Sequence, residues 1–305
     1  MEDYILKAVN LSKSYNKKCV LKNLNMNIKS GDIYGLIGKN GAGKTTLIRL
    51  ITGLANVTSG DIEIFNADND KALTSERKRI GALIEMPAFY GDMTAYDNME
   101  LLRLQKGIPG KACIKEKLEL VGLKAIQKKK VKDFSLGMKQ KLGLAMALLG
   151  DPEFLILDEP TNGLDPMGIV YMRELLKRLN EEKGVTILIS SHLLSELNQL
   201  ATCYGILNNG ELVEELTQKQ LDEKCRKALE VKTNDLKQTA WVLENILKTT
   251  NYKVLPGEVI RIYDYINDPG KVSTALAEAG IIIYQIGVSG DNLESYFMNL
   301  VGGNV

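Results

Sequence analysis

A glycine-rich run, GKNGAGKT at residues 38–45, is the segment best suited to chemistry. Phosphate oxygens need several backbone N–H groups aimed at them from close range, and a loop rich in glycine supplies these. The run fits the pattern G-x-x-x-x-G-K-[ST], in which Lys44 brings a positive charge to the β- and γ-phosphates and the Thr45 hydroxyl ligates Mg²⁺. It predicts a nucleoside triphosphate site formed by Gly38, Lys39, Asn40, Gly41, Ala42, Gly43, Lys44, Thr45 and Thr46.

Two more segments carry groups that such a site needs. The run FLILDEP at residues 154–160 ends a predicted buried strand, where Asp158 can hold Mg²⁺ through water and Glu159 can accept a proton from an attacking water. His192, the one histidine of the chain, follows the apolar run GVTILISS and so ends a strand at the edge where a γ-phosphate would lie. Taken alone, the acidic pair could begin a helix and the histidine could be structural. The phosphate-binding loop favours the functional interpretation of both.

The elements around these residues predict an α/β domain. Residues 1–30 show the alternation of two or three short strands, residues 32–38 form a compact apolar strand, and a helix with a predicted end near Gly53 follows the glycine-rich loop. Residues 60–85 return to a strand pattern, and residues 86–150 are helical and basic. The two apolar runs at 154–160 and 184–192 flank an amphipathic helix, and this strand–helix–strand order predicts a βαβ crossover in a parallel sheet.

The pattern changes after about residue 210. Strands and helices then follow in the order β-α-β-β-α-β, which is the order of a ferredoxin-like α+β domain, and a last helix, DNLESYFMNLV, follows. We therefore expect a nucleotide-binding α/β domain at residues 1–215, with a helical subdomain at about 86–150, and an accessory α+β domain at residues 226–305.

Composition excludes several classes of protein. The formal net charge is +1, which argues against a protein that grips nucleic acid mainly by electrostatics. Five lysines at residues 124–132 lack interleaved aromatic side chains, so they indicate a solvated face. The longest uncharged apolar run is too short to cross a bilayer, and the first residues lack a signal-peptide pattern. The four cysteines form no CxxC pair, so we expect reduced thiols in a cytosolic protein.

Together with DFSLGMKQ at residues 133–140 and NGLD at residues 162–165, these segments resemble the ATP-binding subunit of ABC transporters over roughly residues 4–215. The resemblance implies a P-loop NTPase of ABC type, with a parallel sheet, an antiparallel β subdomain and a helical insert, that binds ATP and Mg²⁺. Asp165 matches the D-loop, Ser135 and Gly137 match the signature motif LSGGQ, and Tyr15 matches the aromatic residue that stacks on adenine. Leu136 and Met138 depart from the signature: they replace its first glycine and its glutamine.

Glu85 is a second departure, because the family usually carries glutamine at this place. Glutamate here, with FSLGM and an accessory domain, resembles the branch that exports bacitracin or confers immunity to lantibiotics. The matching role would make Glu85 a metal ligand with Thr45 and Asp158, so that three carboxylates, those of Glu85, Asp158 and Glu159, would lie near the ion. The alternative is that Glu85 faces solvent or a nearby lysine.

The resemblance also implies partners. Two copies would form a homodimer in which each ATP lies between one P-loop and the other copy's signature, and a separate membrane-spanning permease would dock mostly on residues 85–104. The chain would then be cytoplasmic and peripheral on the inner face of the cell membrane, without nucleic acid as a partner. A soluble ABC ATPase acting on ribosomes or DNA is the alternative, although it would carry two ATPase domains or a long coiled coil. A P-loop kinase or GTPase would leave FSLGM and His192 unexplained.

Overall fold

The computed structural model describes residues 3–16, 18–85, 88–290 and 293–302. The chain divides into two compact units, Met1–Gln218 and Lys219–Val305. The sequence places its two domains at residues 1–215 and 226–305, and the division between the units falls between these bounds. Residues 86–87 of the predicted helical subdomain, and residues 291–292 and 303–305 of the predicted accessory domain, lie outside the described residues.

The first unit is built on a six-stranded sheet in the order β5-β6-β7-β3-β8-β9. The first five of these strands pair in parallel, and β9 runs antiparallel to β8. The continuous apolar runs of the sequence form β3, β6 and β7, which are buried along their whole length because the sheet is covered on both faces. The bounds are β3 (Ile33–Ile37), β5 (Ile80–Leu83), β6 (Phe154–Asp158), β7 (Thr186–Ser191), β8 (Cys203–Asn208) and β9 (Glu211–Thr217).

A three-stranded antiparallel sheet, in the order β2-β1-β4, forms a second layer of this unit. Its strands are β1 (Tyr4–Tyr15), β2 (Lys18–Lys29) and β4 (Ser59–Ile64). The sequence predicts strands in residues 1–30, and the structure confirms them as two strands of twelve residues each. Asn10 and Asn23 have positive φ values of 49° and 43°, and the register between β1 and β2 shifts between Ala8 and Leu11. Such irregularities interrupt the alternation from which strand length is predicted.

Helix α1 (Lys44–Ile51) contacts both β6 and β2, so it packs between the two sheets. Its buried face joins the core formed by Leu6, Leu24, Met26, Leu36, Leu47, Ile48, Ile51 and Ile156, among others. The helix ends as predicted, because Gly53 follows its C-cap with φ +76°. Helix α2 (Asp70–Glu76) and the 3₁₀ turn η1 (Arg77–Arg79) lie in the segment for which the sequence predicts strands alone.

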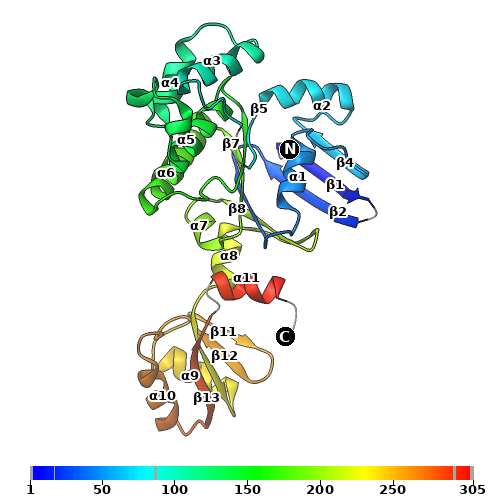
Figure 1. Cartoon of the computed structure of the whole chain (residues 1–305). Helices are drawn as coiled ribbons and strands as arrows, with labels where there is room; N and C mark the ends of the chain where they lie inside the picture. Colours follow the sequence, from blue (N-terminus) through cyan, green and yellow to red (C-terminus); the bar gives the residue numbers. More distant parts are fainter. Residues whose placement is uncertain (1–2, 17, 86–87, 291–292, 303–305) are drawn as a thin grey trace. The chain divides into compact units, whose positions relative to one another are not determined.

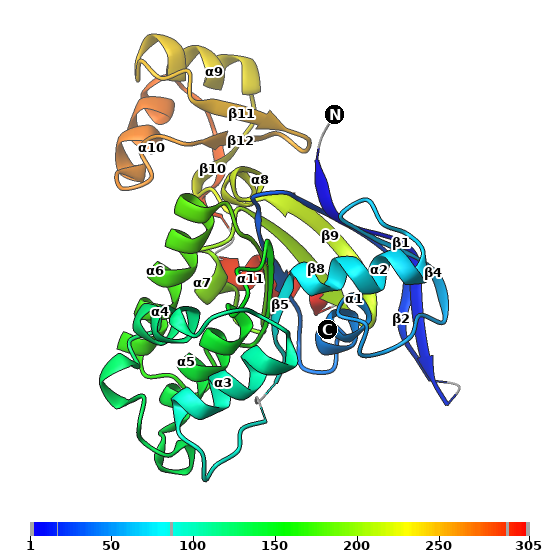
Figure 2. The same ribbon diagram turned by 90° about the horizontal axis from the view of Figure 1, so that it is seen from above.

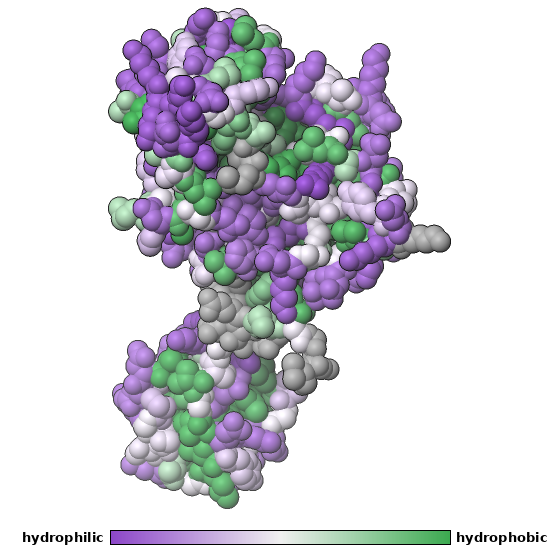
Figure 3. All heavy atoms as spheres, in the orientation of Figure 1, coloured by the Kyte–Doolittle hydropathy of each residue, from purple (hydrophilic) through white to green (hydrophobic). Residues whose placement is uncertain are grey.

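The predicted helical subdomain contains α3 (Ala95–Gln105), α4 (Ala112–Leu120), α5 (Leu136–Ala147) and the 3₁₀ turns η2 (Lys124–Ile126) and η3 (Val131–Asp133). Figures 1 and 2 both show this group beside α6 (Pro166–Lys183), while α1, α2 and the antiparallel sheet lie on the other side of the unit. The short α7 (Leu194–Leu197) follows β7. Hydrophilic side chains cover much of the helical group, and apolar side chains gather in a hollow next to it (Figure 3).

The second unit is a four-stranded antiparallel sheet in the order β11-β12-β10-β13. Its elements follow in the predicted order β-α-β-β-α-β. They are β10 (Ala228–Thr233), α9 (Leu236–Asn245), β11 (Tyr252–Leu255), β12 (Val259–Ile262), α10 (Pro269–Glu278) and β13 (Ile283–Ser289). Apolar side chains of both helices pack on the inward face of β10 and β12 and form its core. Helix α8 (Gln218–Lys224) precedes β10, and α11 (Leu293–Val301) follows β13.

Candidate nucleotide-binding and catalytic site

The glycine-rich loop leads directly from β3 into α1. Gly43 is the N-cap of α1 with φ +115°, and a Cβ on this residue would lie 2.7 Å from Leu21 Cδ2. A Cβ on Gly38 would lie 2.6 Å from the carbonyl oxygen of Leu207. Both positions therefore need glycine, one for its conformation and close packing and the other for close packing alone. The loop thus brings the unpaired N–H groups of the first turn of α1 to the carboxyl edge of the parallel sheet.

Lys44, Thr45 and Asp158 meet at this edge, as the sequence predicts. The Lys44 ammonium donates to the Gly38 carbonyl oxygen at 2.6 Å, and only 6% of the residue is exposed. The Thr45 hydroxyl donates to Asp158 Oδ2 at 2.7 Å. A hydroxyl and a carboxylate side by side are the hard oxygen ligands that Mg²⁺ prefers, and Mg²⁺ usually keeps several waters. These two side chains therefore fit the predicted ion.

Glu159 and His192 lie close together beside Lys44. Glu159 Oε2 lies 2.7 Å from His192 Nδ1, while its other oxygen, Oε1, lies 3.2 Å from Lys44 Nζ. Glu159 follows β6 with φ +49°, a left-handed conformation that a non-glycine residue rarely adopts without local support. The turn of the backbone aims this carboxylate back at the loop. One carboxylate is thereby placed between the P-loop lysine and the single histidine.

Ser190 is a member of the site that the sequence alone does not identify. Its hydroxyl donates to Asp158 Oδ1 at 2.6 Å and accepts from the backbone N–H of Glu159 at 3.0 Å. The side chain is completely buried between β6 and β7, where Asp158 is its register partner. Ser190 therefore fixes both acidic residues at once. The pattern SSH contains it, but the register that brings it to Asp158 cannot be predicted from the sequence.

The structure does not bring Glu85 into this group. Its carboxylate pairs with Arg49 at 2.8 Å, and 59% of its side chain is exposed. Among the described residues, no cluster of three or more acidic, cysteine or histidine side chains could hold a metal ion. Because Glu85 pairs here with a guanidinium on α1 and faces solvent, the structure favours the alternative interpretation of this residue, and its role as a metal ligand stays a prediction.

The remaining candidate residues lie at the ends of other elements. Ser135 is the N-cap of α5, where its hydroxyl accepts from the Met138 N–H at 3.3 Å, and Gly137 lies in the first turn of that helix. Asp165 is the N-cap of α6, where its carboxylate accepts from the Gly168 N–H at 2.7 Å. Tyr15 ends β1 with 44% of its surface exposed, and the Lys13 ammonium lies 4.6 Å from its ring centroid. Each of these contacts is made within the residue's own helix start or strand, and not with the P-loop lysine Lys44.

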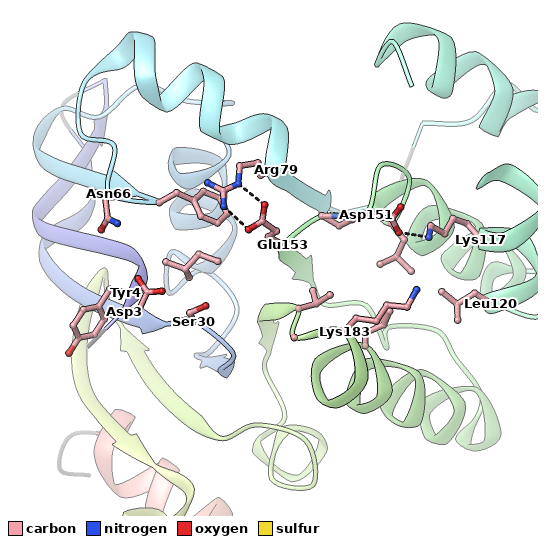
Figure 4. Close-up of a pocket in the computed structure, with 17 residues that line it drawn as sticks. Asp3, Tyr4, Ser30, Asn66, Arg79, Lys117, Leu120, Asp151, Glu153 and Lys183 are labelled. Atoms are coloured by element: carbon pink, nitrogen blue, oxygen red, sulfur yellow. Dashed lines mark hydrogen bonds and ion pairs between the residues drawn. The ribbon is translucent and has the colours of Figure 1, made fainter. Parts of the chain in front are cut away.

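A cavity of about 410 Å³ lies at the opposite, amino edge of the parallel sheet. Figure 4 shows Arg79 facing Glu153 and Lys117 facing Asp151 in its wall. The Arg79 guanidinium makes two bonds of 2.7 and 2.5 Å to Glu153, and Lys117 Nζ lies 2.5 Å from Asp151. These cations and anions neutralise one another, so we assign the cavity no part in the chemistry at the other edge.

Comparison with known proteins identifies the family of the chain. The sequence profile of the ABC transporter family matches residues 21–162. The chain is 45% identical to the bacitracin transport ATP-binding protein BcrA of Bacillus licheniformis, over 98% of both chains. It is 47% identical to the lantibiotic transport ATP-binding protein SrtF of Streptococcus pyogenes, over 68% of this chain and 89% of that one. The chain belongs to the ABC transporter family.

A solved ABC ATPase has the fold of the first unit. The ATP-binding cassette MJ0796, in a dimeric post-hydrolysis state bound to ADP and Pi, aligns with a TM-score of 0.65 and 28% identity. The alignment covers 70% of this chain and 98% of that one. This chain is therefore an ABC ATPase that binds ATP and hydrolyses it. Throughout the parts of the chain that the structure describes, no helix is both long and apolar enough to span a bilayer.

Proposed function

We propose that this chain is the ATP-hydrolysing subunit of an ABC exporter of peptide antibiotics, of which bacitracin and lantibiotics are the favoured cargoes. The observation that carries this proposal is the similarity to BcrA, which spans 299 residues and so takes in the second unit as well as the first. The alignment with SrtF spans 209 residues. Bacitracin is therefore the first cargo to test.

We assign the hydrolytic roles from the contacts at the carboxyl edge of the sheet. Lys44 and the loop N–H groups would hold the β- and γ-phosphates, and His192 would donate to the γ-phosphate. Glu159 would take the proton of a water whose oxygen attacks the γ-phosphorus, while the bond from that phosphorus to the β,γ-bridging oxygen breaks. The products are ADP and phosphate. The pairs Glu159–Lys44 and Glu159–His192, at 3.2 and 2.7 Å, already gather these three groups.

We assign Mg²⁺ to the Thr45 hydroxyl and the Asp158 carboxylate. Bound there, Mg²⁺ would neutralise charge on the β- and γ-phosphates. Ser190 would keep the Asp158 carboxylate oriented toward Thr45, because the two oxygens of this carboxylate accept from Ser190 at 2.6 Å and from Thr45 at 2.7 Å. These bonds would give the proposed metal site a fixed geometry.

We propose a homodimer in which Ser135, Gly137 and Asp165 of one copy face the nucleotide on the P-loop of the other. Each chain has one P-loop and one signature segment, so a two-fold pair makes two complete sites. Tyr15 would stack on the adenine. The MJ0796 cassette, a related domain solved as a dimer, supports dimerisation.

We propose that a separate membrane-spanning permease docks in a groove beside the helical subdomain. Two hollows of about 410 and 450 Å³ share Ala88, Leu102 and Met146 as lining residues, with Ile84, Phe89 and Leu101 nearby. Figure 3 shows the apolar side chains that gather in this part of the unit. An amphipathic segment of a permease fits such a groove. The groove overlaps the predicted docking residues 85–104 and would place the chain on the inner face of the membrane.

Antibiotic susceptibility tests the proposal. A strain that lacks the gene should become more susceptible to bacitracin, and the wild-type gene should restore resistance. A gene that carries Glu159→Gln, expressed at the same level, should not restore it, because the amide cannot accept the proton of the water. Unchanged susceptibility of the deletion strain to bacitracin and to lantibiotics would refute the proposed cargo.

A further inference from the structure

Two leucines and two glycines interlock the signature segment (residues 135–138) with the D-loop (residues 162–165). The Leu136 side chain lies directly on Gly163: a Cβ on Gly163 would be 2.1 Å from Leu136 Cδ2 and 3.1 Å from Leu136 Cγ. In the opposite direction, the Leu164 side chain lies on Gly137, where a Cβ would be 3.3 Å from Leu164 Cδ2. Each segment thus inserts a leucine into the space that a glycine of the other leaves open.

Both segments are fixed at their ends by helix caps. Ser135 caps the twelve-residue α5 and Asp165 caps the eighteen-residue α6, which also begins with a proline. The contact between Leu136 and Gly163 therefore joins the starts of two helices rather than two loose loops. The first residues of a helix move together with the rest of the helix. A change at the contact between Leu136 and Gly163 should therefore affect both α5 and α6.

The D-loop is joined in turn to Glu159. The Asn162 N–H donates to the Glu159 carbonyl oxygen at 3.2 Å, and the Leu164 N–H donates to the Thr161 carbonyl oxygen at 3.1 Å. These bonds fold residues 159–164 into one compact turn. Since Glu159 has a left-handed φ of +49°, its carboxylate direction depends on how this turn is held.

Burial does not account for the leucine at residue 136. It is 42% exposed, whereas the family signature carries glycine at its place, and glycine has no side chain to lay on Gly163. Its side chain instead lies against Gly163, which has φ +76°. Any side chain at residue 163 would occupy the space that Leu136 fills.

We propose that Leu136 is a positioning residue for ATP hydrolysis: seated on Gly163, it holds the D-loop and through it the Glu159 carboxylate. The inference rests on the proposed role of Glu159 as the proton acceptor. In the proposed dimer, Ser135 faces the partner's nucleotide, so the interlock would also link that nucleotide to the Glu159 of the same chain. In this proposed role Leu136 acts only through Gly163 and makes no contact with the reacting atoms.

A double-mutant cycle on the full chain tests the contact. Gly163→Ala should lower kcat about tenfold or more, because overpacking at a tight contact displaces the backbone, while KM for ATP stays close to the wild-type value. Adding Leu136→Ala should bring kcat of the Gly163→Ala variant to within about threefold of Leu136→Ala alone, since the clash is then removed. If the two losses multiply instead, the contact does not carry the coupling and the proposal is wrong.

Gly184→Ala is the matched control for backbone strain. Gly184 has φ +66° at the end of α6, and a Cβ there would meet no atom within 4 Å. This variant should lose thermal stability but keep wild-type kcat, with or without Leu136→Ala. If Gly184→Ala lowers kcat as Gly163→Ala does, strain rather than the interlock explains the loss.

Two variants of Leu136 keep the test valid if Gly163→Ala does not fold. Leu136→Gly should lower kcat several-fold with little change in KM, and Leu136→Met should retain most of the activity because it restores a long apolar side chain. Wild-type kcat in Leu136→Gly would overturn the proposal. Glu159→Gln tests the proposed base separately: near-normal turnover in that variant would refute the base whatever the cycle shows.

Discussion

At the scale of single residues, the two oxygens of the Glu159 carboxylate face two different side chains. Oε1 lies 3.2 Å from the Lys44 ammonium and Oε2 lies 2.7 Å from the His192 ring. Phosphate oxygens of ATP would compete with Glu159 for Lys44, because both are anions that a buried ammonium can pair with. We expect ATP binding to release one carboxylate oxygen for the attacking water.

Ser190→Ala should raise the Mg²⁺ concentration needed for half-maximal ATP hydrolysis. The substitution frees Asp158 Oδ1 and leaves the half-buried Glu159 N–H without the hydroxyl that accepts from it, at a cost of about 1 kcal/mol. Mg²⁺ titration of the ATPase rate measures the effect. Ser190→Thr is the control, since it keeps a hydroxyl and should stay close to wild type. Identical Mg²⁺ curves for all three proteins would exclude a positioning role.

Glu85→Gln should leave both the Mg²⁺ curve and the unfolding free energy almost unchanged. The Glu85–Arg49 pair is solvent-exposed, and exposed ion pairs contribute only about 0–1 kcal/mol. Arg49→Gln removes the other partner of the same ion pair, and its Mg²⁺ curve and unfolding free energy should also stay close to the wild-type values. A steeper loss of activity at low Mg²⁺ in Glu85→Gln alone would return this carboxylate to the metal site.

The site residues that the sequence predicts are those with a reactive or charged side chain that follow the end of an apolar strand. Lys44, Asp158, Glu159 and His192 each stand at or soon after the end of an apolar run, so their shared edge follows from the parallel sheet. Ser190 was not predictable, because its partner depends on the register of two strands 32 residues apart in sequence. The pairing of Glu85 with Arg49 depends on the direction of α1, which the sequence leaves open.

At the scale of elements, predictability depended on how evenly a segment is buried. Strands β6 and β7 lie in the sheet interior, and their unbroken apolar runs identified them. The alternation of residues 4–15 identified β1, although both β1 and β2 carry irregularities near asparagines with positive φ. Helix α2 has a single buried residue, Leu73, so it shows no apolar stripe from which a helix could be predicted.

Cys203 should react with iodoacetamide far more slowly than Cys19 in the folded protein at about pH 8. Burial raises the pKa of the Cys203 thiol at the start of β8 to about 12, with the negative charge of Asp32 adding to the shift. A raised pKa keeps the thiol protonated, and the thiolate is the reactive form, so labelling should increase as pH rises toward that value. Cys19 is exposed. Peptide mass spectrometry distinguishes the two sites, and equal labelling rates would contradict the burial of Cys203.

At the scale of the whole molecule, the permease groove makes a prediction about coupling. Leu102→Lys should abolish bacitracin resistance in cells while the purified chain keeps its ATPase activity, because a buried ammonium would exclude an apolar partner from the groove. Leu104→Lys is the matched control: it lies two residues further along α3, is 60% exposed and lines neither hollow. If the two variants confer equal resistance, the permease docks elsewhere.

Dimer formation is the property of the whole molecule that depends on every part of the site. Glu159→Gln should bind MgATP and accumulate as a dimer, because the amide keeps the shape of the carboxylate but cannot take the proton that leads to hydrolysis and opening. Gel filtration with MgATP should then show twice the mass of one chain, and with MgADP the mass of one chain. Lys44→Ala is the control that should remain monomeric with either nucleotide, since it lacks the charge that holds the phosphates. If Glu159→Gln binds ATP and stays monomeric, then either Glu159 is not the proton acceptor or the chain does not form the shared-site dimer. Single-turnover hydrolysis by the same variant distinguishes the two explanations. Fast hydrolysis in this variant would mean that another group accepts the proton.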